Sequence, residues 1–170
     1  MSLDNSKTQI ILLAAGNSTR FSNKNNKLLI NFKNKSLLEY NILQLKAQNF
    51  IKITVVLNKI ALSKSEFFRN VEIIKGGKTR SQSVKNALIN SKFNSKYVII
   101  HDAARPLYST KLINKICKLI RSNKYDCVIP YSECSDTILK DNIDIDRAKL
   151  RLIKTPQAFR KTKLIKLHLN

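Results

Sequence analysis

The 170-residue chain has little glycine, cysteine and acidic charge, and it has no tryptophan. It contains three glycines, where average usage of about 7% would give roughly twelve. This count excludes a collagen, a Gly-rich linker protein and a GxGxxG dinucleotide-binding protein. No apolar run approaches the roughly 20 residues that span a bilayer, and residues 1–5 lack the basic and apolar regions of a secretory signal. We therefore expect a cytoplasmic protein without a membrane anchor.

Cysteine and histidine are too sparse for a disulfide framework or a zinc site. Cys117, Cys127 and Cys134 are odd in number and lack C-x-x-C spacing, so we expect reduced thiols. The two histidines, His101 and His168, do not stand at finger spacing from a cysteine. A Ser-His-Asp triad is poorly supported, because His101 and the aspartate after it are adjacent in an apparent strand and should point to opposite faces.

Basic residues greatly outnumber acidic ones, with 32 Lys and Arg against 11 Asp and Glu. A net charge of +21 would suggest nucleic acid or another anionic partner. The lysines are spread along the chain, however, and form no block of five to eight basic residues. A codon bias would produce the same excess. We expect no dedicated nucleic-acid binding, and interpret the positive field as one that gathers phosphorylated small molecules.

Short apolar runs alternate with amphipathic segments through most of the chain, and 43% of the residues are hydrophobic, enough for a packed core. We expect strands at 9–13, 51–57, 71–74, 97–100 and 127–129, and helices at 36–48, 63–68, 81–89, 110–121 and 160–169. Ser36 is a plausible N-cap. The alternation predicts an α/β fold with a mostly parallel sheet.

The pattern changes between residues 136 and 154, where polar and apolar residues alternate around a polar centre. This favours a β-hairpin or an extended arm that leaves the body. We therefore divide a single domain into a nucleotide-binding core at 9–135, a β-arm at 136–154, and a return segment with a helix at 155–170.

The three glycines follow two of the expected strands, Gly16 after the first and Gly76 and Gly77 after the third. In an open α/β sheet, ligands bind at the carboxyl ends of the strands. Glycine serves there where the backbone bends sharply or approaches a ligand closely. The placement predicts a binding site at this edge.

The loop after the first strand combines small residues with cations. Ala14, Ala15 and Gly16 leave backbone N–H groups open to a nucleotide, while Arg20 and Lys27 suit phosphate oxygens. The spacing is not that of a Walker A loop. The alternative interpretation is a solvated basic loop.

Two further strand ends carry candidate residues. Gly77 enters a helix whose first turns hold Arg80 and Ser83, a place that favours anions, although an ordinary Ser-capped helix would look the same. Asp102 ends a buried strand, where a carboxylate needs a partner. It would serve as an oxygen ligand for Mg²⁺ beside a triphosphate; the alternative is a helix cap paired with Arg105.

Together these segments resemble the 2-C-methyl-D-erythritol 4-phosphate cytidylyltransferase family of non-mevalonate isoprenoid synthesis. The matching stretches, in family order over residues 9–169, are LAAGNSTRF with Lys27, GGKTRSQSV, HDAARP, the SDT of 135–137, the DR of 146–147 and the TPQAF of 155–159. HDAARP favours this family over the ribitol- and sugar-phosphate nucleotidyltransferases that share its fold.

The resemblance implies a fold of the nucleotide-diphospho-sugar transferase type and an enzyme that transfers a cytidylyl group from CTP to methylerythritol phosphate. It implies Arg20 and Lys27 as the catalytic pair and Asp102 as the ligand of Mg²⁺. The positions matched to nucleotide binding are Ala14, Ala15, Gly16, Gly77, Ser83, Ala103 and Arg105. Thr137, Arg147 and Thr155 match positions that hold the acceptor, and the arm implies a homodimer.

The chain departs from the family pattern at three places. Asn26 and Leu28 flank the catalytic lysine where Pro and Gln are usual, and Lys78 stands where an acidic residue is common. Family members also continue past the position of Asn170, so we expect the C-terminal part of the family domain to be missing. The chain would then be a fragment, or the front part of an enzyme fused to a cyclodiphosphate synthase.

Two other functions stay open on the sequence. One is a nucleotidyltransferase of the same fold with another sugar or alditol phosphate as acceptor. The other is an inactive, truncated nucleotide-binding domain or a basic interaction module.

Overall fold

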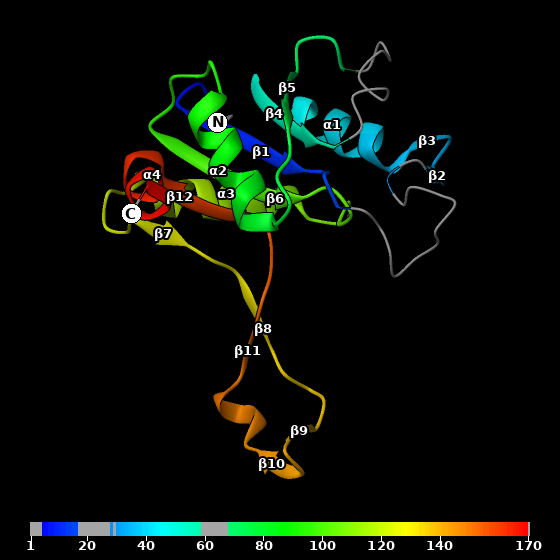
Figure 1. Ribbon diagram of the computed structural model, residues 1–170, viewed down its shortest axis with the longest axis vertical. Helices are drawn as coiled ribbons and strands as arrows, with labels where there is room; N and C mark the ends of the chain where they lie inside the picture. The colour runs from blue at the N-terminus through cyan, green and yellow to red at the C-terminus, as the bar shows by residue number, and fades with distance from the viewer. Residues whose placement is uncertain (1–4, 17–27, 29, 59–67, 170) are drawn as a thin grey trace.

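A twisted six-stranded sheet with helices on both faces forms the body of the protein, shown by a computed structural model (Figure 1). The structure describes residues 5–16, 28, 30–58 and 68–169. The strand order is β5-β4-β1-β6-β12-β7. Neighbouring strands from β5 to β6 run parallel, whereas β12 is antiparallel to both β6 and β7. The expected α/β fold with a mostly parallel sheet is confirmed.

The sheet strands are β1 (Thr8–Leu13), β4 (Lys52–Leu57), β5 (Glu72–Lys75), β6 (Tyr97–Asp102), β7 (Cys127–Val128) and β12 (Gln157–Arg160). The helices are α1 (Leu37–Ala47), α2 (Arg80–Asn90), α3 (Thr110–Arg121) and α4 (Lys161–Leu169). A small hairpin, β2 (Asn31–Phe32) with β3 (Lys35–Ser36), precedes α1.

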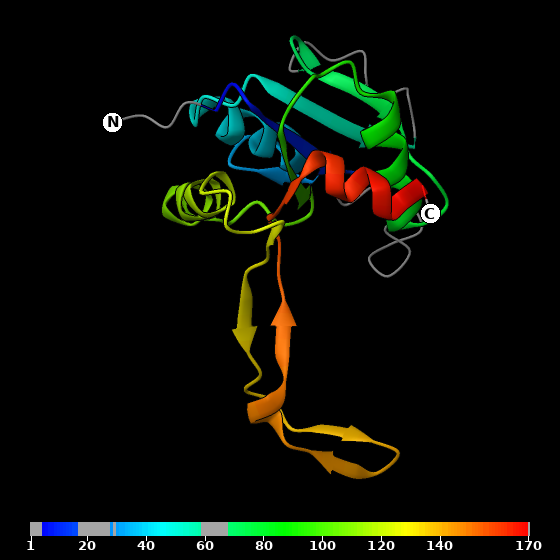
Figure 2. The same cartoon turned by 90° about the vertical axis from the view of Figure 1, so that its left-hand side faces the viewer.

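Side chains alternate between the two faces of the sheet and build two cores. In β1, Ile10 and Leu12 pack in one core with α1 and α3, whereas Ile11 packs in the other with α2 and α4. Figure 2 shows the corresponding pairs of helices on opposite sides of the sheet. Because both faces of the sheet are covered by helices, the sequences of its central strands are continuous apolar runs, as is typical of parallel sheets.

Helix starts follow the capping chemistry of the sequence. Ser36 caps α1 as expected, its hydroxyl accepting from the backbone N–H of Glu39 at 3.1 Å. Ser109 caps α3 in the same way. For α2 the cap is Thr79, and the helix begins at Arg80, one residue before the expected start. Most of the helix expected at 63–68 lies outside the described residues.

β12 is the element that the sequence analysis missed. The segment was expected to return to the body and enter a helix at Arg160, but Gln157–Arg160 forms a strand between β6 and β7, and α4 begins at Lys161. Its four residues are too few for a periodic signal. The insertion of this strand brings Thr155 to the end of β6.

The expected arm projects far from the sheet (Figures 1 and 2). It consists of two antiparallel ribbons, β8 (Tyr131–Glu133) with β11 (Arg151–Ile153), and β9 (Ile138–Lys140) with β10 (Ile143–Ile145). A 3-10 turn at Arg147–Lys149 joins β10 to β11. Since β8 precedes residue 136, the projecting ribbon is longer than the 136–154 segment.

Candidate functional site

Three of the expected site segments meet at the carboxyl edge of the sheet. The backbone N–H of Ala103, just after β6, donates to Leu13 O at the end of β1, at 2.9 Å. The N–H of Ala14 donates to Val56 O of β4, also at 2.9 Å. These bonds continue the ladder beyond the strands, so the loops after β1 and β6 leave side by side.

Gly76, after β5, is required because there is no room for a side chain, and not because of its backbone conformation. None of the three glycines has a positive φ, so the expected need for a special bend is not met. A Cβ on Gly76 would collide with Ala15 Cβ and would lie 2.6 Å from Asn58 Oδ1. Asn58 in turn donates to Ala15 O at 2.7 Å. Gly76 therefore lets the loops after β1 and β5 touch.

Ser83 shapes the Gly77 turn. Its hydroxyl accepts from the N–H of Gly77 at 3.0 Å and donates to Thr79 O at 2.9 Å, and the residue is buried. Both partners belong to the loop that enters α2. In this structure Ser83 thus fixes the loop backbone. Its matched role in nucleotide binding stays a prediction.

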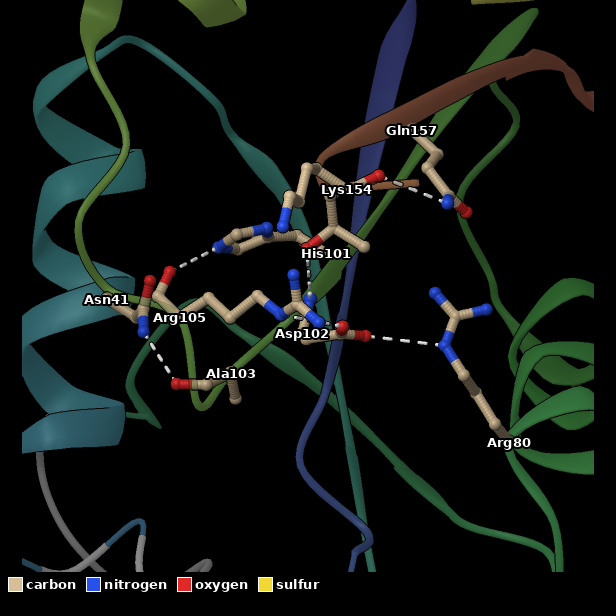
Figure 3. Close-up of polar contacts among 9 residues, drawn as sticks. Asn41, Arg80, His101, Asp102, Ala103, Arg105, Lys154 and Gln157 are labelled. Carbon is tan, nitrogen blue, oxygen red and sulfur yellow. Dashed lines mark hydrogen bonds and ion pairs between the residues drawn. The ribbon is translucent and has the colours of Figure 1, made fainter. Parts of the chain in front are cut away.

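Asp102 is the charged centre of the edge. Its Oδ1 lies 3.3 Å from Nε of Arg80, and its Oδ2 lies 3.3 Å from Nε of Arg105 (Figure 3). The Asp102 side chain is 26% exposed, and the side chains of Arg80 and Arg105 are about half exposed. Of the alternative interpretation, a helix cap paired with Arg105, the pairing is present but the cap is not, since α3 begins eight residues later under Ser109. The cluster carries two cations against one carboxylate, so it attracts anions.

Arg80 is a site residue that the sequence analysis noted in the entry of α2 but did not assign. The sequence feature that could have indicated its role is its position in the first turn of a helix that starts beside a glycine pair. The partner could not be read from the sequence, because α2 and the end of β6 meet only through the packing of α2 on the sheet.

His101 points to the other side of β6, as the strand alternation predicts. Its ring is 1% exposed and packs edge-on against Tyr108, with 4.7 Å between ring centroids. Burial lowers the pKa of His101 from 6.5 to about 4. The imidazole is therefore neutral near pH 7 and lies apart from the charged cluster.

The acceptor-binding candidates do not gather at this edge within one chain. Thr155 does lie beside Asp102, its Oγ1 3.5 Å from the Asp102 backbone nitrogen. Thr137 and Arg147 lie on the arm, both exposed, and Arg147 donates to Ser135 O at 2.8 Å. Figures 1 and 2 show that the arm holds its outer ribbon away from the sheet.

Arg20 and Lys27, the expected catalytic pair, lie outside the described residues. Ala14 to Gly16 are the described part of that loop, and a Cβ added to Gly16 would meet no atom of the described residues within 4 Å. The open space beside Gly16 is compatible with a nucleotide.

A magnesium site was tested against the donor groups present. Within the described ranges, no three His, Cys, Asp or Glu side chains gather where they could hold a metal. Asp102 supplies one carboxylate, and Mg²⁺ commonly takes one or two carboxylates together with substrate phosphates. The residues therefore fit an ion that arrives with a triphosphate, provided that one carboxylate oxygen releases its arginine.

Among the described helices, none has both the length and the apolar composition needed to cross a lipid bilayer.

Comparisons with known proteins identify the family of the chain. The family model described as "IspD: 2-C-methyl-D-erythritol 4-phosphate cytidylyltransferase" matches residues 8–170. The chain is 44% identical over 168 residues to a "Bifunctional enzyme IspD/IspF" of Pelagibacter ubique, covering 94% of this chain and 45% of the relative. A second relative of that description, from Campylobacter jejuni, is 40% identical and is covered to 42%.

Solved structures show the same fold. The bifunctional IspDF of Campylobacter jejuni superposes with a TM-score of 0.85 at 37% identity, over 95% of this chain and 43% of that one. A 4-diphosphocytidyl-2C-methyl-D-erythritol synthase from Anaerococcus prevotii gives a TM-score of 0.80 at 24% identity, over 98% and 76%, and supports the fold. The chain spans somewhat less than half the length of the bifunctional relatives.

Proposed function

Since the chain belongs to the 2-C-methyl-D-erythritol 4-phosphate cytidylyltransferase family, we propose that it transfers a cytidylyl group from CTP to 2-C-methyl-D-erythritol 4-phosphate. A phosphate oxygen of the acceptor attacks the α-phosphorus of CTP. The bond from that phosphorus to the bridging oxygen breaks, and pyrophosphate leaves. The observation that carries the proposal is the Asp102 cluster with Arg80 and Arg105, set beside the small-residue loop at the carboxyl edge.

The nucleotide would lie over the loops that follow β1, β5 and β6. Ala14, Ala15 and Gly16 leave room for a base and ribose, and Ala103 lies beside them through its bond to Leu13 O. Gly77 would contribute backbone from the adjacent loop. Cytidine would thus be held mainly by main-chain groups, which approach closely because side-chain bulk is absent.

The triphosphate would lie against the cations. Arg80 and Arg105 present guanidinium groups at the edge, and each can bind phosphate oxygens in a fork geometry. Arg20 and Lys27 would stabilise the charge that develops on the α-phosphate. Phosphoryl-type transfer depends mostly on positioning and electrostatic stabilisation, so a preformed set of cations is the main requirement.

Magnesium would be held by Asp102 together with phosphate oxygens of CTP. When bound, the ion would neutralise negative charge on the triphosphate. Asp102 would exchange one of its arginine contacts for the ion, and the released guanidinium would become available to phosphate.

The acceptor would be held by Thr155 and by arm residues of a second copy. Thr137 and Arg147 are exposed on an arm that holds its outer ribbon away from its own sheet. The same arm exposes Leu139 and Ile143, which are 61% and 68% accessible. These features support a homodimer in which each arm completes the partner's site. In sedimentation velocity, the chain should run as a dimer and a Leu139→Asp/Ile143→Asp variant as a monomer; a monomeric unmodified chain would contradict the dimer.

The activity is tested by incubating the chain with CTP, Mg²⁺ and 2-C-methyl-D-erythritol 4-phosphate and following pyrophosphate release. Turnover should be lost in Arg20→Ala and Lys27→Ala. Arg69→Ala is a matched control, since Arg69 is exposed and precedes β5 at the opposite edge of the sheet. Turnover only with another sugar or alditol phosphate would replace the proposed acceptor, and CTP binding without turnover would reject catalysis by this chain.

We further propose that the protein works in the cytoplasm. All three cysteines are free thiols, and Cys127 is exposed, which suits a reducing compartment. Fractionation of source cells followed by an activity assay tests this placement.

A further inference from the structure

Two buried polar side chains hold the turn that carries Asp102 and Arg105. Asn41, on α1, is 0% exposed and donates from Nδ2 to Ala103 O at 2.8 Å. His101, 1% exposed, places Nε2 2.9 Å from Arg105 O. A carbonyl can only accept, so His101 Nε2 carries the proton. The Arg105 N–H donates to Asp102 O at 3.0 Å and closes the turn.

Both hydrogen bonds reach the turn from the side on which α1 packs. Figure 3 shows Asn41 and His101 on one side of β6 and Arg80 on the other, with the turn between them. The two acceptors, Ala103 O and Arg105 O, are alternate carbonyls of the turn. Holding both carbonyls inward fixes the backbone from which the Asp102 and Arg105 side chains project.

Core packing does not account for these residue types. Asn41 stands on the face of α1 that also carries Leu38, Ile42 and Leu45, all 0% exposed. Among the described residues, neither its Oδ1 nor Nδ1 of His101 has a hydrogen-bond partner. A buried polar atom without a partner is costly, and an apolar side chain of similar size would avoid this cost. What the two side chains provide in return is one hydrogen bond each to the same turn.

The ion pairs at the surface would not hold the turn alone. The Arg105 side chain is 51% exposed, and exposed pairs contribute little because water and salt screen them. The buried bonds from Asn41 and His101 are shielded from water. The buried hydrogen bonds from Asn41 and His101, rather than the exposed ion pairs, therefore keep the turn ordered.

We propose that Asn41 and His101 are positioning residues for nucleotide binding, which keep the 102–105 turn in the shape that presents Asp102 and Arg105 to the triphosphate. This inference rests on the proposed function for the identity of the nucleotide. Neither side chain touches substrate in this account; both act through the backbone of the turn.

The test compares His101→Leu with His101→Gln. Leu removes the donor, whereas Gln keeps an N–H donor at nearly the reach of Nε2. Asn41→Leu removes the second anchor. Ile53→Ala is the matched control, because Ile53 is buried in the same core cluster as part of β4 but makes no bond to the turn. For each variant we would measure the melting temperature, the Kd for CTP by calorimetry, and hydrogen exchange at the Arg105 amide.

His101→Leu and Asn41→Leu should each raise the Kd for CTP about tenfold, the ratio that corresponds to roughly one net hydrogen bond. Exchange at the Arg105 amide should accelerate in both. His101→Gln should restore both values towards those of the unmodified chain. Ile53→Ala should lower the melting temperature and leave the Kd unchanged. In an Arg105→Ala background, His101→Leu should add little to the loss of affinity, because both act through one turn.

The inference is overturned if His101→Leu leaves the Kd and the amide exchange unchanged, or if its effect adds fully to that of Arg105→Ala. If Asn41→Leu does not fold, the Leu and Gln variants of His101 decide the result alone. Absence of CTP binding by the unmodified chain would instead reject the proposed function. Hydrogen exchange would then still decide whether the two side chains order the turn.

Discussion

Arg80, in the first turn of α2, and Asp102, the last residue of β6, form an ion pair with 3.3 Å between Nε and Oδ1, although 22 positions separate them. The pair joins the start of α2, which follows β5, to the end of β6 across the ends of β4 and β1. It also keeps one guanidinium group at the edge of the sheet where a triphosphate would bind. Arg80 therefore belongs to the candidate site even though the sequence analysis did not assign it.

Replacing Arg80 by Ala should raise the KM for CTP about tenfold, because a charge-assisted bond to phosphate is lost. Arg80→Lys should be intermediate, since an ammonium offers a point charge without the planar fork. Steady-state kinetics at saturating acceptor measures the effect. Arg69→Ala removes the same charge at the opposite edge and should leave the KM unchanged. Equal values for the Arg80 and Arg69 variants would contradict the placement of Arg80 in the site.

Replacing Gly16 and Gly76 by alanine should affect different properties, CTP binding for Gly16 and stability for Gly76. Gly76→Ala forces a Cβ against Ala15 and Asn58, so the free energy of unfolding should fall by about 1–3 kcal/mol. The methyl group of Gly16→Ala meets no atom of the described part of the chain within 4 Å, so the stability of this variant should stay close to that of the unmodified chain. It should nevertheless weaken CTP binding, because the added methyl occupies the proposed nucleotide space. Urea unfolding and calorimetry separate the two effects; unchanged CTP affinity in Gly16→Ala would place the nucleotide elsewhere.

Acid should destabilise the protein through His101. Burial lowers the folded-state pKa of His101 to about 4, against 6.5 for the free side chain, so the unfolded chain binds the extra proton first. Its contribution to stability is complete above pH 6.5 and is lost as the pH falls through 4. The loss should approach about 3 kcal/mol.

Urea unfolding between pH 7 and pH 4 measures this loss. His101→Gln should flatten the pH dependence by that amount. An identical pH profile for His101→Gln and the unmodified chain would show that the imidazole is not buried.

The three thiols should differ in reactivity. Cys127 is exposed, whereas Cys117 and Cys134 are buried, and burial raises the pKa of Cys117 to about 11. Since the thiolate is the reactive form, a thiol-modifying reagent at pH 8 should label one cysteine quickly and the other two only after unfolding. Cys127→Ser should abolish the fast phase. Rapid labelling of Cys117 in the folded chain would contradict the packing of α3.

Local chemistry made much of the fold predictable from the sequence. The apolar runs at 9–13 and 97–100 and the amphipathic pattern at 110–121 became β1, β6 and α3 with small changes at their ends. Ser36 capped α1 because its hydroxyl acts on a neighbouring N–H. The change of pattern after residue 135 indicated the arm. Each of these signals lies within a few residues of the element that it specifies.

Other features depended on segments that are distant in the sequence. β12 is a four-residue strand whose hydrogen-bond partners are β6 and β7, both distant in the sequence. The roles proposed for Thr137 and Arg147 require a second copy of the chain. The roles of Arg20 and Lys27 stay predictions.

In the candidate site, too, some features follow from the sequence and others only from the tertiary structure. The sequence by itself determined which residue types follow each strand, because the glycines, the alanines and the strand-end aspartate are identified directly from it. It also determined the family. Only the tertiary structure decided that Arg80 contacts Asp102, that Ser83 serves the Gly77 turn, and that Asn41 and His101 support Ala103 and Arg105 from the core. The physical reason is that such bonds need atoms within about 3 Å, and separation along the chain carries no information about that distance once a sheet has folded.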